Sequence, residues 1–153
     1  MSHIHDKIDF TVETFVVYQN KVLLRKHDKY RKWLSVGGHI ELDEDPNLAA
    51  IREVKEEVGL DVRLFGSAIS FEEKNYQELI PPRFLNRHRI NDTHEHITLV
   101  YFAKSDNDEL KLSEKEVSEE CRWFTRKEIE KNTYGIKESI QYYALTALDE
   151  LKE

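Results

Sequence analysis

The sequence predicts an α/β domain in which a curved mixed β-sheet lies between helices, as an α/β/α sandwich. Segments with strand-like patterning outnumber segments with helical patterning, and the helical segments are apolar along one stripe only, so each needs a sheet to pack on. The chain has 153 residues, of which 39% are hydrophobic and 10% aromatic. That is enough for one folded domain, which we expect to span residues 1–153.

The first predicted elements form a β-hairpin. Residues 10–18 are rich in β-branched and aromatic side chains, which favour a strand. Gln19-Asn20 predicts a turn, and residues 21–26 predict the returning strand. Residues 33–36 then lead into Gly37-Gly38, which we expect to form a loop in front of a helix.

A helix is predicted between Asp45 and Gly59. Asp45 is a suitable N-cap, Pro46 is favoured at the first helical position, and Gly59 can adopt the left-handed conformation that ends a helix. A rotation of about 100° per residue divides its side chains between two faces. The predicted apolar stripe contains Leu48, Ile51, Val54 and Val58, and the opposite face carries Glu53, Glu56 and Glu57.

The acidic face of this helix predicts a divalent cation. Glu56 and Glu57 lie in the last turn, where the helix dipole disfavours an anion by about 0.3–1 kcal/mol. Neighbouring carboxylates also repel one another unless a cation lies between them. Such oxygen ligands suit Mg²⁺, or Mn²⁺, which commonly hold substrate phosphates as well. The alternative is a solvated acidic face, which is common in a chain with 35% charged residues.

The rest of the chain predicts three more strands and two helices. The clearest strand should be central to the sheet, and Thr125 with Glu128 forms a capping-box pattern at the start of a helix. The predicted strands are residues 62–71, 96–104 and 121–124, and the closing helix is residues 136–151.

The charge and composition exclude several classes of protein. The net charge is −7, which argues against a nucleic-acid polymer as partner but allows a small phosphorylated substrate held through metal ions. The single cysteine, Cys121, excludes an internal disulfide. There is no apolar run of the ~18 residues needed to span a membrane and no signal-peptide pattern, so a cytoplasmic protein is expected.

The segment from Gly38 to Leu60 carries a long spaced motif. Five residues separate Gly38 from Glu44, and seven more separate Glu44 from Arg52, after which the chain reads Arg-Glu-Val-Lys-Glu-Glu-Val-Gly-Leu. This pattern resembles the signature of the Nudix hydrolases, and the short chain is similar to the small MutT-like members. The resemblance implies the Nudix sandwich fold. It also implies hydrolysis of a nucleoside diphosphate linked to another moiety, most directly a nucleoside triphosphate, by attack of water at phosphorus.

The resemblance also implies roles for the residues of the motif. Glu56 and Glu57 would be the principal metal ligands, with the backbone carbonyl of Gly37 or Gly38. Glu53 would be either a further ligand or the general base. Arg52 would orient the glutamates through ion pairs, and Glu44 would brace the loop before the helix.

Candidates outside the motif carry a weaker signal. A further base or ligand could come from Glu95, Glu119 or Glu120, although an exposed surface charge is the favoured alternative for each of them taken singly. Arg25 ends a strand where relatives often hold a phosphate, although an exposed charge is an equal alternative. Tyr76 lies 16 residues past the motif, where some subfamilies that hydrolyse dinucleoside polyphosphates carry a tyrosine.

Two further stretches are candidates for contacts with substrate or metal. Residues 81–89 predict a loop in which Phe84 stacks a base and Arg87, with its neighbouring arginines, holds phosphates. The alternative is an exposed connection whose arginines pair with acids. His94 and His96 share one face of a strand and could bind a transition metal, but no third ligand is apparent, which favours a strand edge or the wall of a pocket.

Whether the motif is complete distinguishes between alternative functions of this family. An isopentenyl diphosphate isomerase would have a degenerate motif, and a non-catalytic nucleotide-binding module would have lost glutamates, whereas this chain retains them all. Hydrolysis of a dinucleoside polyphosphate or an ADP-sugar stays open. The proline typical of ADP-ribose pyrophosphatases is replaced by Asn75. A homodimer is frequent among relatives, and the sequence leaves the oligomeric state open.

Overall fold

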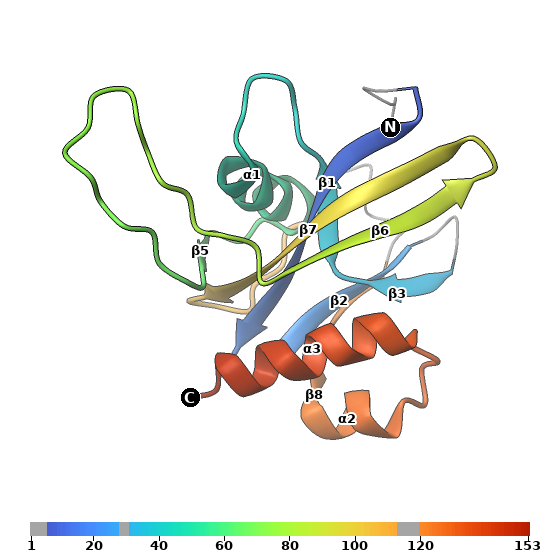
Figure 1. Cartoon of the computed structure of the whole chain (residues 1–153). Helices are drawn as coiled ribbons and strands as arrows, with labels where there is room; N and C mark the ends of the chain where they lie inside the picture. Colours follow the sequence, from blue (N-terminus) through green and yellow to red (C-terminus); the bar gives the residue numbers. More distant parts are fainter. Residues whose placement is uncertain (1–5, 28–30, 113–119) are drawn as a thin grey trace.

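The computed structural model describes residues 6–27, 31–112 and 120–153. A mixed sheet forms the middle layer, with helix α1 on one face and helices α2 and α3 on the other (Figure 1). This confirms the predicted α/β/α sandwich. Each helix in the described part of the chain is too short or too polar to cross a membrane.

The sheet is built around two long parallel strands. The order of the main path is β3-β2-β1-β7-β5, while β4 pairs with β1, β6 with β7 and β8 with β2. Strands β1 and β7 run parallel, and the other pairs are antiparallel. The strands are β1 (Ile8–Tyr18), β2 (Lys21–His27), β3 (Lys32–Leu34), β4 (Val36–His39), β5 (Val62–Leu64), β6 (Phe84–Asn91), β7 (His94–Ser105) and β8 (Glu120–Thr125). The helices are α1 (Pro46–Val58), α2 (Arg126–Lys131) and α3 (Glu138–Glu150).

The predicted hairpin and central strand are confirmed. Gln19 and Asn20 have φ of 44° and 60°, as a tight turn between twisted strands requires, and Tyr18 pairs with Lys21 across it. Strand β7 pairs with β1, β5 and β6, which makes it central. The capping box at Thr125 is also present, with Glu128 bonded back to the backbone of Thr125.

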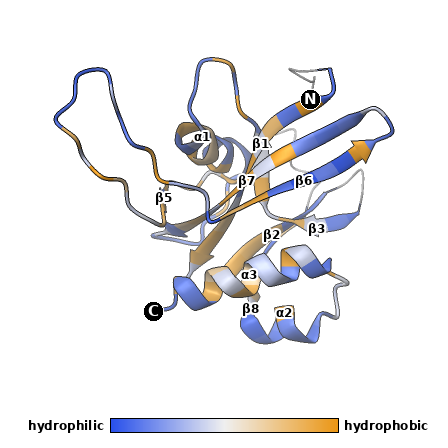
Figure 2. Cartoon of the chain, in the orientation of Figure 1, coloured by the Kyte–Doolittle hydropathy of each residue, from blue (hydrophilic) through white to orange (hydrophobic). Residues whose placement is uncertain are grey.

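Alternate residues of β1 face two separate hydrophobic clusters. Phe15 and Val17 belong to the cluster that packs on α3, whereas Val12 and Val16 belong to clusters that pack under α1. Figure 2 shows the apolar colours of β2 and of the C-terminal part of β1, near the centre of the sheet. The side chain of every second β1 residue therefore belongs to the α3 side of the sheet.

The predicted face of the Nudix-like helix is wrong in part. Leu48 and Ile51 are 56% and 38% exposed, while small residues, Ala49 and Ala50, are fully buried. Their small side chains let the helix lie close to Tyr101 in the sheet. The buried face of α1 is therefore rotated towards Glu53 and Glu57. The buried residues of this helix are Ala49, Ala50, Glu53, Val54, Glu57 and Val58.

Three other expectations from the sequence are corrected. The strand predicted over 62–71 is only Val62–Leu64, because the chain leaves the sheet before Gly66, which has a φ of 125°. Gly37 and Gly38 lie within strand β4 rather than in a loop. Most of 81–89 is strand β6, which pairs with β7, rather than a loop.

Candidate active site

Helix α1 holds two of its glutamates against the sheet. Its first turn is fixed by Asp45, whose carboxylate accepts a hydrogen bond from the Leu48 amide at 2.9 Å, and it ends at Gly59, which has a φ of 75°. Glu53 and Glu57 lie one turn apart on its buried face and are 6% and 7% exposed. The helix therefore presents adjacent carboxylates to the strands that it covers.

Strand β4 approaches these carboxylates at Gly38. A methyl group built on Gly38 would lie 2.3 Å from Glu53 Oε1, so any side chain there would displace the carboxylate. Gly37 is equally restricted on the other side, since a methyl group there would lie 2.2 Å from the backbone oxygen of Val12. The glycine pair thus brings backbone carbonyls and a carboxylate into one small space.

Arg52 ties the acidic residues of the motif together. Its guanidinium donates to Glu44 at 2.6 Å and 2.9 Å, to Glu53 at 3.0 Å and to Glu56 at 3.1 Å. It also donates to the backbone oxygen of His39 at 3.1 Å. These bonds fix the loop before α1, the helix and strand β4 relative to one another.

Arg25 forms an ion pair with the motif. Its Nε lies 3.1 Å from Glu57 Oε2, and the two side chains are 11% and 9% exposed. The alternative of an exposed charge at the end of β2 is therefore wrong. In the structure, Arg25 is paired with Glu57. A contact between Arg25 and a substrate phosphate stays a prediction.

The charges of the motif suit a divalent cation. Burial raises the pKa of Glu53, against the opposing effect of Arg52, and a cation bound nearby would favour its charged form. The hydrogen bonds from Arg52 lower the pKa of Glu44, which keeps that residue an anion bound to the arginine. Glu56 is the exposed member, with 61% of its side chain accessible. The donor set is made of carboxylate and backbone oxygens, which fit Mg²⁺ or Mn²⁺.

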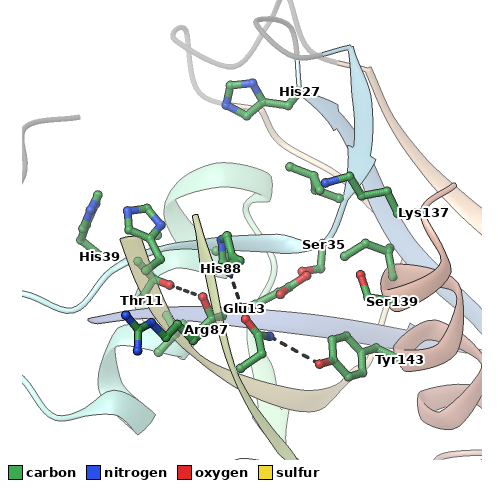
Figure 3. A pocket seen from close by; sticks show the side chains of 18 of the residues that line it. Thr11, Glu13, His27, Ser35, His39, Arg87, His88, Lys137, Ser139 and Tyr143 are labelled. Atoms are coloured by element: carbon green, nitrogen blue, oxygen red, sulfur yellow. Dashed lines mark hydrogen bonds between the residues drawn. The ribbon is translucent and has the colours of Figure 1, made fainter. Parts of the chain in front are cut away.

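A cavity of about 510 Å³ lies beside the motif and is lined by both glycines of β4. Figure 3 shows it bounded by strands of the sheet and by the first turns of α3, which contribute Ser139 and Tyr143. Its size is that of a typical site for a small molecule. The cavity therefore forms a chamber next to the acidic motif.

The most unusual group in this chamber is Glu13. It lies on β1, pairs with Gly37 of β4 and lines the cavity. Burial raises the pKa of Glu13, and the Ser35 hydroxyl beside it opposes the shift. Sequence reasoning did not single out Glu13, because nothing along the chain marks one residue of the first strand as part of a cavity.

The raised pKa of Glu13 predicts how stability depends on pH. Between its unfolded and folded pKa values the native state binds more protons, so Glu13 makes stability fall as the pH rises through the folded pKa. We expect Glu13→Gln to raise the melting temperature at pH 8, with the gain shrinking at pH 4. Thermal unfolding of both proteins across this range measures it. A gain that is equal at both pH values would contradict the assignment.

Histidines form the other end of the chamber. His39 and His96 line the cavity, and the ring centroids of His96 lie 5.1 Å from His39, 5.2 Å from His94 and 5.6 Å from His88. Burial, and then the neighbouring histidines, lower the pKa of His96 to about 4, so the ring is neutral at pH 7. The interpretation of His96 as part of a pocket wall is therefore supported by its position.

Phe84 does not have the position expected for a base-stacking side chain. It pairs with Val100 and packs on Tyr143 with a centroid distance of 4.9 Å, as part of the core under α3. Arg83 pairs with Glu150 at 2.8 Å. The side chain of Phe84 is therefore used in packing, because the residue begins a strand.

The remaining candidates lie away from the acidic motif. Arg87 and Glu95 form an exposed ion pair with each other at 2.8 Å across β6 and β7, although Arg87 also borders the cavity. Tyr76 is 57% exposed and contacts Phe71. Glu120 is exposed at the start of β8, and Glu119 lies outside the described residues. Roles for these residues stay predictions.

Comparison with known proteins identifies the family. A family model described as NUDIX domain matches residues 11–145. The chain belongs to the Nudix family. A crystal structure of a NUDIX family hydrolase from Clostridium perfringens is similar to this Nudix chain, with a TM-score of 0.85 and 37% identity, covering 94% of this chain and 98% of that one. The match supports the assignment over nearly the whole Nudix domain.

Two curated proteins are also similar to this Nudix chain. A "Dihydroneopterin triphosphate diphosphatase" from Haemophilus influenzae is 40% identical over 76 residues, which cover 49% of this chain and 48% of that protein. A "Probable DHNTP pyrophosphohydrolase" from Lactococcus lactis subsp. cremoris is 27% identical over 111 residues, which cover 72% and 63%. The matched regions thus span about half of the first relative and less than two thirds of the second.

Proposed function

We propose that the protein is a Mg²⁺-dependent diphosphohydrolase that cleaves a phosphoanhydride of a nucleoside-triphosphate-like substrate by attack of water at phosphorus. The observation that carries this proposal is the joining of the acidic motif to the polar cavity through Gly37 and Gly38. A triphosphate chain bound at the motif would leave its ring in the cavity. Such a reaction depends mainly on positioning and on neutralising charge.

Different residues of the motif would bind the metal ion, accept a proton and position the ligands. Glu56 and Glu57 would hold the metal ion with a backbone carbonyl of β4, and Glu53 would be a further ligand or accept the proton of the attacking water. A bound divalent ion polarises the phosphoryl oxygens and acidifies water. Arg52 positions Glu53 and Glu56 through its hydrogen bonds, and Arg25 positions Glu57. Fixing these carboxylates in advance avoids reorganisation during the reaction.

We infer that the preferred substrate carries a pterin or guanine ring, with dihydroneopterin triphosphate as the first candidate. Both rings place an N–H beside an amino group, and one carboxylate can accept hydrogen bonds from both. Glu13 lies on the cavity wall, where its carboxylate could accept hydrogen bonds from this N–H and this amino group. The names of the two curated relatives point to the same substrate class.

A comparison of triphosphates tests the proposal. With Mg²⁺, we expect faster release of diphosphate from dihydroneopterin triphosphate and GTP than from ATP. A dinucleoside polyphosphate and an ADP-sugar should be poor substrates. Loss of hydrogen bonds to a charged group costs about 1.5–3 kcal/mol, so Glu13→Gln should lower kcat/KM by about 10- to 100-fold for the first two substrates and little for ATP.

Controls separate ring recognition from chemistry in this experiment. Glu41→Gln removes an exposed carboxylate from one of the five unspecified positions between Gly38 and Glu44, and it should change neither preference nor rate. Rapid hydrolysis of a dinucleoside polyphosphate or an ADP-sugar would contradict the proposed substrate class. It would still support the proposed hydrolysis of a phosphoanhydride. Binding of Mg²⁺ without turnover of any substrate would favour a nucleotide-binding module.

A further inference from the structure

A second group of candidate metal ligands lies away from the acidic motif. Asp9 is on β1, His94 and His96 are on β7, and the parallel register pairs Asp9 directly with His96. Donor atoms of these three side chains all lie within 4.8 Å of one another. Within residues 6–27, 31–112 and 120–153, this is the one group of three or more such side chains that meets this distance.

The distances within the group resemble those between ligands of one small ion. His94 Nε2 lies 3.3 Å from Asp9 Oδ2. Two ligands bonded to zinc at 2.0–2.1 Å in a tetrahedron are separated by about 3.3 Å. His96 is partly exposed at the cavity, which leaves its ring room to turn towards the other two.

The surroundings also hold the group in an orientation suited to a metal. The other ring nitrogen of His94, Nδ1, lies 3.4 Å from the backbone oxygen of Asp6, a contact that directs Nε2 towards Asp9. His39 Nε2 lies 3.1 Å from the same oxygen of Asp9. Metal-binding histidines and carboxylates are commonly held by outer contacts of this kind. Asp9 and His94 are 0% and 3% exposed, so these orientations are fixed by packing.

We propose that Asp9, His94 and His96 bind a transition-metal ion of the zinc class, with His39 holding the Asp9 carboxylate and the fourth metal position facing the cavity. Two imidazoles and one carboxylate favour zinc or a similar ion over Mg²⁺, which prefers oxygen ligands. The site joins the N-terminal parts of β1 and β7, and His96 connects it to the cavity. It is distinct from the acidic motif, whose donors are oxygens.

Cobalt absorption spectroscopy tests this site without any substrate. In chelator-treated full-length protein, Co²⁺ bound by imidazole ligands in a tetrahedral site absorbs visible light strongly, whereas an octahedral all-oxygen site absorbs weakly. We expect a strong band that saturates at a single equivalent of Co²⁺ and disappears when Zn²⁺ is added. His96→Ala should weaken Co²⁺ binding by at least about 10- to 100-fold, since even outer contacts have effects of this size.

Three further variants make the result specific. His27→Ala removes a histidine on a different part of the cavity wall and should leave the band unchanged (Figure 3). Glu57→Gln alters the acidic motif and should also leave it unchanged. Asp9→Asn should weaken the band, with circular dichroism used to verify that the variant is folded.

A weak spectrum in the unmodified protein would overturn the proposal. So would a strong band that is lost in Glu57→Gln but kept in His96→Ala. Either result would leave the histidines as a metal-free wall of the cavity. Because hydrolysis with Mg²⁺ is measured separately, failure of the zinc site would not be confused with failure of the proposed enzyme activity.

Discussion

Glu57→Gln is expected to reduce turnover by about 10²- to 10³-fold, the range found when one preorganised electrostatic group is removed from an active site. The substitution keeps the shape of the side chain but removes the charge that would bind a metal ion and that pairs with Arg25 at 3.1 Å. Diphosphate release with saturating Mg²⁺ measures the loss. Titration with Mn²⁺ should show weaker binding in the same variant.

The control for this prediction is an exposed glutamate of another helix, outside the motif. Glu130→Gln on α2 removes an exposed carboxylate, which pairs with Arg126 at 3.4 Å, and should leave turnover unchanged. Both variants should retain the circular dichroism spectrum of the unmodified protein. Near-normal turnover in folded Glu57→Gln would remove Glu57 from the metal site.

Alanine at Gly37 and alanine at Gly38 are expected to damage the protein in different ways. At Gly37 the new methyl group would lie 2.2 Å from a backbone oxygen of β1, so the paired strands must separate. Such overpacking costs about 1–3 kcal/mol of unfolding free energy. At Gly38 the methyl group would meet the end of the Glu53 side chain at 2.3 Å, and that side chain can move. Gly37→Ala should therefore lose stability, and Gly38→Ala should chiefly lose activity.

Denaturant unfolding and Mg²⁺-dependent turnover, measured on both glycine variants, test this distinction. Gly135→Ala is a useful reference, because a methyl group there would meet nothing within 4 Å although the φ of 68° is unfavourable to alanine. It reports the cost of backbone strain without a clash. Equal losses of stability in Gly37→Ala and Gly38→Ala, with equal activities, would contradict this prediction. Such a result would mean that a clash with the β1 backbone and a clash with the Glu53 side chain have the same effect.

The sequence predicted those features that depend on local patterns. The hairpin at Gln19-Asn20, the caps of the helix at Asp45 and Gly59, and the capping box at Thr125 each depend on a few neighbouring residues, and all are present. The ordered spacing of the motif also identified the family correctly. These features need no knowledge of which strands pair.

The features that the sequence did not reveal depend on distant pairing. Asp9 and His96 are neighbours only because β1 and β7 run parallel in one register, so no spacing along the chain marks them as a pair. Glu13 lines the cavity together with Gly37 of β4, which is its partner in the sheet and is distant in sequence. Phe84 was expected to stack a base in an arginine-rich loop, whereas the residue pairs with Val100 and packs against the core.

The alternation of β1 has a consequence for how such a protein can diverge. Thr11 and Glu13 line the cavity, while Val12 and Val16 pack beneath α1, which carries the acidic motif. Successive codons of one strand are thus subject to unrelated selection, one set for whatever the cavity holds and the other for support of the motif. A descendant of this chain can acquire a new substrate by replacing alternate residues of a single strand, and its phosphorus chemistry is inherited intact.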